Sequence, residues 1–317
     1  MSQSPPRFVC IPLGAAGGRD EGNLSAYLIA ASDSHDFICL DAGTIATGLA
    51  VAAKRGSFDD VSLPSDSPLT LEGEVLHHHV KGYFISHGYL DHVEGLVQAS
   101  PTDTGKPIFA MAGVLDDLEK HLFNWKLWPN FADRGVEPCL NIYRYEELRA
   151  GIAKTVPGTP LRVTAYPLSH GPHTDSTAFL IASGDEYLLY MGDTGPDAVE
   201  QRNTTGDLWE VIVPLLRSGR LHGIFVETSY INNRPDAQLF SHLTPRWLFR
   251  ALRQLAERVD AAAPQTALAG LTVVITHIKP DFSATAPPVP CVHRELHEEN
   301  DLGVQLHFAE QGEKILL

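Results

Sequence analysis

The chain has 317 residues, of which 39 are acidic and 24 are basic, so its formal net charge is −15. This balance argues against binding to nucleic acids or to anionic membranes, since both carry negative charge. With 44% hydrophobic and 20% charged residues, the composition is that of a globular protein and excludes a disordered or collagen-like chain. No segment has the roughly 20 apolar residues that span a bilayer, and the N-terminus does not resemble a leader peptide, so we expect a cytoplasmic protein.

Short apolar runs, most of them closed by Gly or Asp, alternate with amphipathic stretches along the chain. This pattern predicts strands over residues 7–14, 24–31, 36–41, 80–86, 107–111, 161–168, 177–182, 186–191, 223–227 and 271–276, and helices over 44–54, 93–99, 113–128, 208–218 and 245–259. The polar stretch 56–73 and the proline-rich stretch 284–290 are predicted to be surface loops, too short for domain linkers. We therefore expect one α/β domain over residues 1–317, built of stacked sheets flanked by helices.

Fifteen histidines in an acidic chain favour metal ligation, the commonest reason to place imidazoles beside carboxylates. The most informative segment covers residues 83–95, where a predicted strand runs into a turn and then a helix. Such a turn can bring His87, Asp91 and His92 to one point. Each histidine alone is more often a surface or core residue, but the group suits zinc, manganese or iron better than calcium.

Three further apolar strands end in a potential metal ligand, namely His170, Asp193 and His277. Ligands at strand ends converge on one rim of a sheet. In its order of histidines and aspartates, the sequence resembles the metallo-β-lactamase superfamily. That resemblance implies an α/β fold of the αββα four-layer sandwich type.

The run from His87 through Leu90, Asp91 and His92 to Ser100-Pro101 resembles more closely the signature of the class II 3′,5′-cyclic-nucleotide phosphodiesterases. The resemblance extends from about residue 7 to the C-terminus. Further landmarks in the family's order are residues 13–18, Leu40-Asp41-Ala42-Gly43-Thr44, His121-Leu122-Phe123-Asn124, Gly192-Asp193-Thr194-Gly195-Pro196, Glu227-Thr228-Ser229-Tyr230, His242-Leu243-Thr244-Pro245 and His277-Ile278-Lys279-Pro280. The resemblance implies metal-dependent hydrolysis of cAMP or cGMP to the nucleoside 5′-monophosphate. It also implies that a metal-bound hydroxide attacks, held at one or two divalent ions. Zinc is the first expectation, with Mn²⁺ or Fe²⁺ as alternatives.

The resemblance also implies the metal ligands, with a first ion at His87 and His170, a second at Asp91, His92 and His277, and Asp193 bridging the two. Tyr89 departs from the family, because it stands where the signature has its second histidine. It could ligate as a phenolate, or pack while a water completes a weaker site. Loss of activity through this change is a third alternative. The full set of predicted ligands is His87, Tyr89, Asp91, His92, His170, Asp193 and His277.

A departing O3′ alkoxide needs a proton, and the predicted donor is His242, with Glu227 as the carboxylate that orients it. A His–Glu pair keeps an imidazole protonated near neutral pH, as this role requires. The alternative is that His242 caps the helix after Pro245 while Glu227 binds a surface amine. The predicted catalytic set is Asp91, Asp193, Glu227 and His242.

Lys279, His173 and Asn124 are the predicted contacts to substrate, although a lysine before proline is more often solvated and His173 could equally face water. The expected partner is a small cyclic nucleotide, without nucleic acid or membrane, and a homodimer is left open. Two rival functions remain. One is another phosphodiester or ester hydrolase of the same fold, and the other is a catalytically impaired metal- or nucleotide-binding protein, suggested by Tyr89.

Overall fold

A computed structural model of the protein describes residues 6–172, 174–282 and 287–317. The chain forms two compact units. The first contains the chain up to Ala15, Asp20–Ala165 and Glu310–Leu317, and the second contains Ala16–Arg19 and Tyr166–Ala309. The expectation of one domain over residues 1–317 stays a prediction.

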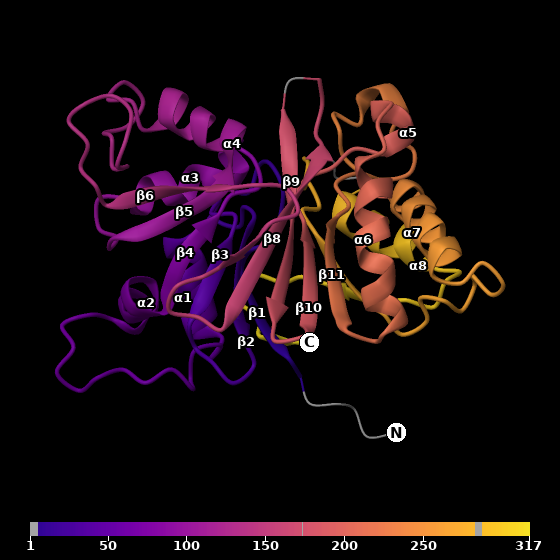
Figure 1. The fold of residues 1–317 in the computed structure, drawn as a ribbon, viewed down its shortest axis with the longest axis horizontal. Coiled ribbons are helices and arrows are strands. Elements are labelled where there is room, and N and C mark those ends of the chain that lie inside the picture. Colours follow the sequence, from indigo (N-terminus) through magenta and orange to yellow (C-terminus); the bar gives the residue numbers. More distant parts are fainter. Residues whose placement is uncertain (1–5, 173, 283–286) are drawn as a thin grey trace. The chain divides into compact units, whose positions relative to one another are not determined.

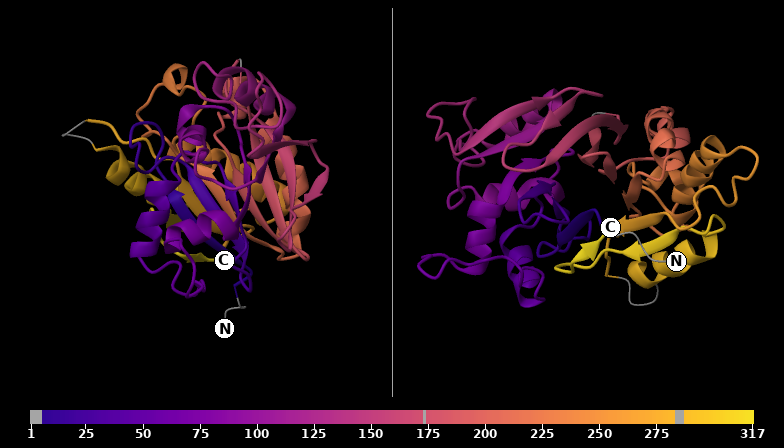
Figure 2. Two further views of the ribbon diagram at one scale, coloured as in Figure 1. Left: turned by 90° about the vertical axis from the view of Figure 1, so that its left-hand side faces the viewer. Right: turned by 60° about the horizontal axis from the view of Figure 1, so that its bottom comes forward.

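The first unit is built on a seven-stranded sheet with the order β14-β1-β2-β3-β4-β5-β6. Strands β1 to β3 pair antiparallel and β3 to β6 pair parallel, while the C-terminal strand β14 pairs with β1 (Figure 2). The strands are β1 (Phe8–Gly14), β2 (Ala26–Ala31), β3 (Phe37–Leu40), β4 (Val80–Phe84), β5 (Lys106–Met111), β6 (Tyr143–Leu148) and β14 (Ile315–Leu316). The helices are α1 (Ala46–Lys54), α2 (Leu71–Glu74), α3 (Leu90–Ala99) and α4 (Ala112–Asp117), with π-helical turns η1 (Val75–His79) and η2 (Leu118–Leu122).

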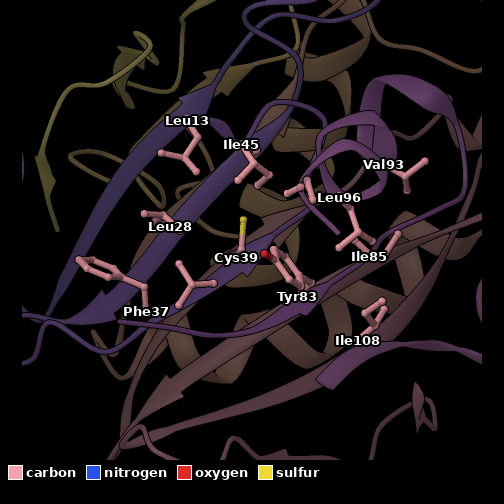
Figure 3. Close-up of a cluster of buried hydrophobic side chains, with 14 of the residues drawn as sticks. Leu13, Leu28, Phe37, Cys39, Ile45, Tyr83, Ile85, Val93, Leu96 and Ile108 are labelled. Carbon is pink, nitrogen blue, oxygen red and sulfur yellow. The ribbon is translucent and has the colours of Figure 1, made fainter. Parts of the chain in front are cut away.

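The core of the first unit joins this sheet to α3 (Figure 3). Leu13 and Leu28 project from β1 and β2, and Cys39 projects from β3. Val93 and Leu96, three residues apart, form the apolar stripe of α3 and are fully buried. This packing fixes α3 against the end of β4, which is where the histidine motif lies.

The second unit is built on a sheet with the strand order β13-β12-β11-β10-β9-β8. Strand β8 begins in the first unit, where β7 (Ala153–Thr155) pairs with its first residues, and continues into the second unit. Strands β10 to β13 run parallel, so their carboxyl ends share one edge of the sheet. Helices α6, α7 and α8 pack beside this sheet (Figure 1). The elements are β8 (Leu161–Ser169), β9 (Asp175–Ser183), β10 (Glu186–Met191), β11 (Leu221–Glu227), β12 (Thr272–Thr276), β13 (Gln305–Phe308), α5 (Asp197–Glu200), α6 (Thr204–Arg217), the 3₁₀ turn η3 (Asp236–Gln238), α7 (Pro245–Val259) and α8 (Pro288–Glu299).

Every predicted strand is present, and four of the five predicted helices agree with the structure within a few residues. The helix predicted over 113–128 was too long, because helical backbone ends at Leu122 and Trp125 adopts a φ of 62°. The loop predicted over 56–73 was wrong at its end, because α2 begins at Leu71. The loop predicted over 284–290 was wrong from Pro288, where α8 begins, and residues 284–286 lie outside the described residues. In α8 the prolines occupy the first turn, where a missing N–H costs little. The short strands β6, β7, β13 and β14 were not predicted.

In the part of the chain that the structure describes, no helix combines the length and apolar character needed to cross a membrane.

Candidate metal centre and acid pair

The histidine motif lies where β4 ends and α3 begins, within the first unit. His87 and His92 are fully buried, and their ring centroids lie 4.1 Å apart. Asp91 stands beside His92 in the first turn of α3, where a carboxylate also interacts favourably with the helix dipole. The structure therefore brings the two predicted imidazole ligands of this motif together and keeps Asp91 at the same helix end.

Asp41, which follows β3, is a buried carboxylate that holds this motif in place. It accepts hydrogen bonds from the Ser86 backbone N–H at 2.7 Å, from the Ser86 hydroxyl at 2.8 Å and from His92 Nδ1 at 2.8 Å. Its φ of 53° is in the left-handed region, a conformation that costs energy for a residue other than glycine. Because Nδ1 of His92 is bound to Asp41, Nε2 is the ring nitrogen that can ligate a metal.

Tyr89 lies at the N-cap position of α3 with an extended backbone. Its ring meets the His87 ring edge-on, with centroids 4.9 Å apart, and 48% of the residue is exposed. This position beside a predicted ligand is compatible with a phenolate ligand and with a packing role. Both alternatives for Tyr89 stay predictions.

Within the second unit, five buried side chains gather at the edge where the parallel strands end. Asp193 follows β10, Glu227 ends β11 and His277 follows β12. His170 follows β8, and His242 precedes α7. The ligand atoms of His170, Asp193 and His242 lie within 4.8 Å of one another, as do those of Glu227, His242 and His277. Imidazole and carboxylate donors at such spacing suit a divalent ion of the zinc type.

His277 is held tightly in this cluster. Its Nδ1 lies 3.0 Å from the hydroxyl of Ser229, and its Nε2 lies 3.2 Å from Asp193 Oδ2. A Cβ at Gly17 would lie only 2.4 Å from the His277 ring, so the backbone of Gly17 approaches too closely for any other residue. The φ of His277 is 57°, in the left-handed region. These contacts fix the ring, and because Nδ1 is engaged by Ser229, Nε2 is again the ring nitrogen that can ligate a metal.

His170 shows the same arrangement, because its Nδ1 lies 3.1 Å from the backbone carbonyl of Ser241. Burial lowers the pKa of His170 to about 4. The imidazole is therefore neutral near pH 7, which is the form that binds a metal.

His242 and Glu227 form a buried pair. Nδ1 of His242 lies 2.9 Å from Glu227 Oε1, and Glu227 is only 1% exposed. Burial, together with the negative charge of Asp193, raises the pKa of Glu227 to about 7. A cation at Asp193 would act in the opposite direction and keep Glu227 ionised. The alternative that Glu227 binds a surface amine is wrong, because the carboxylate is buried and its Oε2 accepts from the hydroxyl of Ser229 at 2.7 Å.

The alternative that His242 caps the following helix is also wrong. The N-cap residue of α7 is Thr244, and Nδ1 of His242 is engaged by Glu227.

The predicted substrate contacts fall in different places. Lys279 follows His277 by two residues and lines a cavity of the second unit. Asn124 lies in the first unit, where its Nδ2 donates to the carbonyl of Lys120 and its Oδ1 accepts from two backbone N–H groups of its own turn. His173 lies outside the described residues. The roles of all three in binding substrate stay predictions.

Asp41, Ser229 and Gly17 were not predicted to have a role in the site. Each belongs to a stretch already noted as a landmark and lies within three residues after the end of a strand. Their positions next to strand ends were the available signal, but their contacts with specific imidazoles arise only in the folded chain.

Buried histidines and carboxylates at the carboxyl ends of parallel strands form donor sets that suit a divalent metal ion. Two of the solved structures that match this chain illustrate the fold. The crystal structure of unliganded yeast PDE1 matches with a TM-score of 0.81 at 22% identity, covering 98% of this chain and all of that one. The metallo-β-lactamase fold protein YhfI from Bacillus subtilis matches with a TM-score of 0.59 at 15% identity, covering 97% and 99%. The predicted fold class is confirmed.

Sequence relatives narrow the class further. The profile of cAMP phosphodiesterases class-II matches residues 7–312. A 3′,5′-cyclic-nucleotide phosphodiesterase of Aliivibrio fischeri is 40% identical over 97% of this chain and 92% of its own length. A probable 3′,5′-cyclic-nucleotide phosphodiesterase of Yersinia pestis is 38% identical over 98% and 90%. This chain belongs to the class II cAMP phosphodiesterases, so the predicted family and enzyme class are confirmed.

Proposed function

We propose that the protein hydrolyses the P–O3′ bond of a 3′,5′-cyclic nucleotide, cAMP or cGMP, and releases the nucleoside 5′-monophosphate. Membership of the family supports the substrate class. The observation that carries the reaction is the buried His242–Glu227 pair, which lies against Asp193 and His277 within the second unit. An imidazole held in this way can protonate a leaving alkoxide.

We propose zinc as the resident metal, in one or two ions, on the ligands that the family resemblance implies. All four predicted histidine ligands support this assignment, because His87, His92, His170 and His277 each have Nδ1 engaged by an oxygen. When bound, such ions offset the charge of the phosphodiester and make water acidic enough to deliver hydroxide at neutral pH.

His242 is the proposed proton donor in the cleavage step. As hydroxide derived from water adds to phosphorus and the P–O3′ bond breaks, O3′ takes a proton from Nε2 of His242. The Nδ1–H group of His242 stays hydrogen-bonded to the Glu227 carboxylate. Glu227 itself is oriented by the backbone N–H and the hydroxyl of Ser229, at 3.1 and 2.7 Å. Glu227 therefore stabilises the charged imidazole and fixes the direction in which it donates.

The proposed reaction is tested by the identity of the product. Incubation of the zinc-loaded protein with cAMP is expected to yield 5′-AMP, identified by ³¹P NMR and chromatography. Formation of 3′-AMP, or no turnover of cAMP or cGMP with Zn²⁺, Mn²⁺ and Fe²⁺ supplied in turn, contradicts the assignment. Faster cleavage of linear diesters than of cyclic ones would favour the rival hydrolase of the same fold.

A cytoplasmic location and a small-molecule substrate, without nucleic acid or membrane, are part of the proposal. The net charge of −15 supports them, since it disfavours anionic polymers and lipid surfaces. A homodimer stays an open prediction, which sedimentation of the zinc-loaded protein would test.

Tyr89→His is expected to tighten binding of the first metal and to raise turnover when metal is limiting. It restores an imidazole next to His87, whose ring the tyrosine now contacts edge-on. Calorimetric titration of zinc into the metal-free protein measures the effect. If the phenolate is instead a working ligand, Tyr89→Phe loses metal and Tyr89→His brings little gain. Equal affinity and turnover in all three proteins would show that Tyr89 is neither a ligand nor a defect.

A further inference from the structure

A cavity of about 540 Å³ lies within the second unit, in the size range of pockets that hold small molecules. Its polar lining includes Arg19, Tyr230, Arg234, Gln238, Lys279 and Asp281. Three cations and one carboxylate give it a positive balance, in contrast to the net charge of −15 of the whole chain. Such a concave positive surface attracts an anion locally even though the protein as a whole repels it.

Arg234 forms a flat cationic surface in this cavity. Its guanidinium carbon lies 4.2 Å from the centroid of the Tyr230 ring, and its Nε donates to the carbonyl of Gln238 at 2.8 Å. Among the described residues, no carboxylate forms an ion pair with Arg234. The guanidinium carbon also lies 5.5 Å from the centroid of the Phe240 ring. The guanidinium is thus held by two rings and a neutral carbonyl, so its charge is not cancelled by a partner.

The loop that carries Arg234 is braced from α7. Asp236 accepts hydrogen bonds from the Arg246 guanidinium at 2.5 Å and from Trp247 Nε1 at 2.9 Å. The backbone N–H of Arg246 donates to Asn232 Oδ1 at 2.8 Å. These contacts restrict the loop, and a restricted binding surface loses less entropy when a ligand binds.

The cavity begins beside the proton donor. The rings of Tyr230 and His242 meet edge-on with centroids 5.8 Å apart, and Lys279 follows His277 by two residues. In a cyclic nucleotide the base is attached to the ribose on the side away from phosphorus. With phosphorus at His242, the ribose and base can therefore extend along Tyr230 toward Arg234.

We propose that this cavity receives the nucleoside part of the substrate, with the base stacked on the guanidinium plane of Arg234. Nucleic-acid bases stack on arginine planes as well as on aromatic rings, and the contact with the Tyr230 ring holds the Arg234 guanidinium in the cavity wall. Arg234 and Tyr230 are then residues that determine specificity, whereas the reacting phosphate lies at the cluster around His242. The inference rests on the proposed hydrolysis of cyclic nucleotides.

Arg234→Lys is the decisive variant, because it keeps the positive charge and removes the plane. In the zinc-loaded protein, Arg234→Lys and Arg234→Ala are expected to weaken binding of 5′-AMP and to raise KM for cAMP by roughly 5- to 100-fold, with kcat nearly unchanged. Calorimetry measures 5′-AMP binding directly, without turnover. Ribose 5-phosphate, which has no base, should bind Arg234→Lys as well as it binds the original protein.

The matched control is Arg220→Ala, which removes another arginine stacked on a tyrosine, Tyr187, near the amino end of β11. It should bind 5′-AMP normally. Wild-type affinity of Arg234→Lys for 5′-AMP, or equal losses for 5′-AMP and ribose 5-phosphate, would overturn the proposal, and so would failure of the original protein to bind 5′-AMP. If the original protein binds 5′-AMP, Arg234→Lys does not, and cAMP is not hydrolysed, the proposed reaction fails while the nucleoside site stands.

Discussion

His242→Ala is expected to lower turnover of cAMP by about 10²- to 10⁴-fold, the usual contribution of a positioned general acid, while zinc content per chain stays unchanged. The O3′ alkoxide is a poor leaving group, and His242 is the imidazole whose Nδ1 is held by Glu227 at 2.9 Å. Steady-state kinetics with cAMP, together with metal analysis of the same preparation, check both parts of the prediction.

The leaving group provides the internal control for this experiment. A phosphodiester that releases nitrophenolate needs no proton, so His242→Ala should cleave it with a much smaller loss. Equal losses for both substrates would exclude the role of general acid. Because the ligand atoms of His242 also lie within 4.8 Å of those of His170 and Asp193, loss of zinc in His242→Ala would instead assign His242 as a ligand.

Much of the site was predictable because its residues follow predicted strands. His87, Asp193 and His277 each come directly or almost directly after an apolar run, and parallel pairing brings the ends of β10, β11 and β12 to one edge. Strand ends are local signals, since a few apolar residues followed by a turn define them.

The supporting contacts were not predictable in the same way. Asp41 and His92 are 51 residues apart, and Ser229 and His277 are 48 apart. Such hydrogen bonds depend on how strands are ordered in a sheet, which no short pattern in the sequence specifies. The same holds for Arg234 on Tyr230, because a stacking contact within a loop has no spacing rule.

Two local predictions were wrong. One helix was predicted too long because a hydrogen-bonded turn ends it, and one helix start was predicted as a loop because it contains prolines. The turn after Leu122 interrupts an amphipathic stretch, with Asn124 bonding the backbone of that turn. Prolines near residue 288 indicated a loop, yet α8 begins there because prolines are tolerated in a first helical turn.

His277→Ala is expected to lower zinc content and to reduce cAMP turnover at least as strongly as His242→Ala, because it removes a proposed metal ligand rather than the proposed proton donor. The ring is fixed by Ser229, Asp193 and the backbone of Gly17, so no other side chain can take its place without rearrangement. Zinc per chain, measured after dialysis at fixed free zinc, is the first readout, and turnover at saturating zinc is the second.

Ser229→Ala and His222→Ala complete the series. Ser229→Ala removes the oxygen that engages Nδ1 of His277 and also donates to Glu227 Oε2, but it leaves the His277 ring in place. Zinc affinity should therefore fall by about 10- to 100-fold, less than in His277→Ala. His222→Ala removes a histidine that pairs with Glu186 near the start of β11 and should leave zinc content unchanged. The expected order of zinc loss is therefore His277→Ala, then Ser229→Ala, then His222→Ala. Full zinc occupancy in His277→Ala, at the affinity of the original protein, would remove His277 from the ligand set and with it the proposed second metal position.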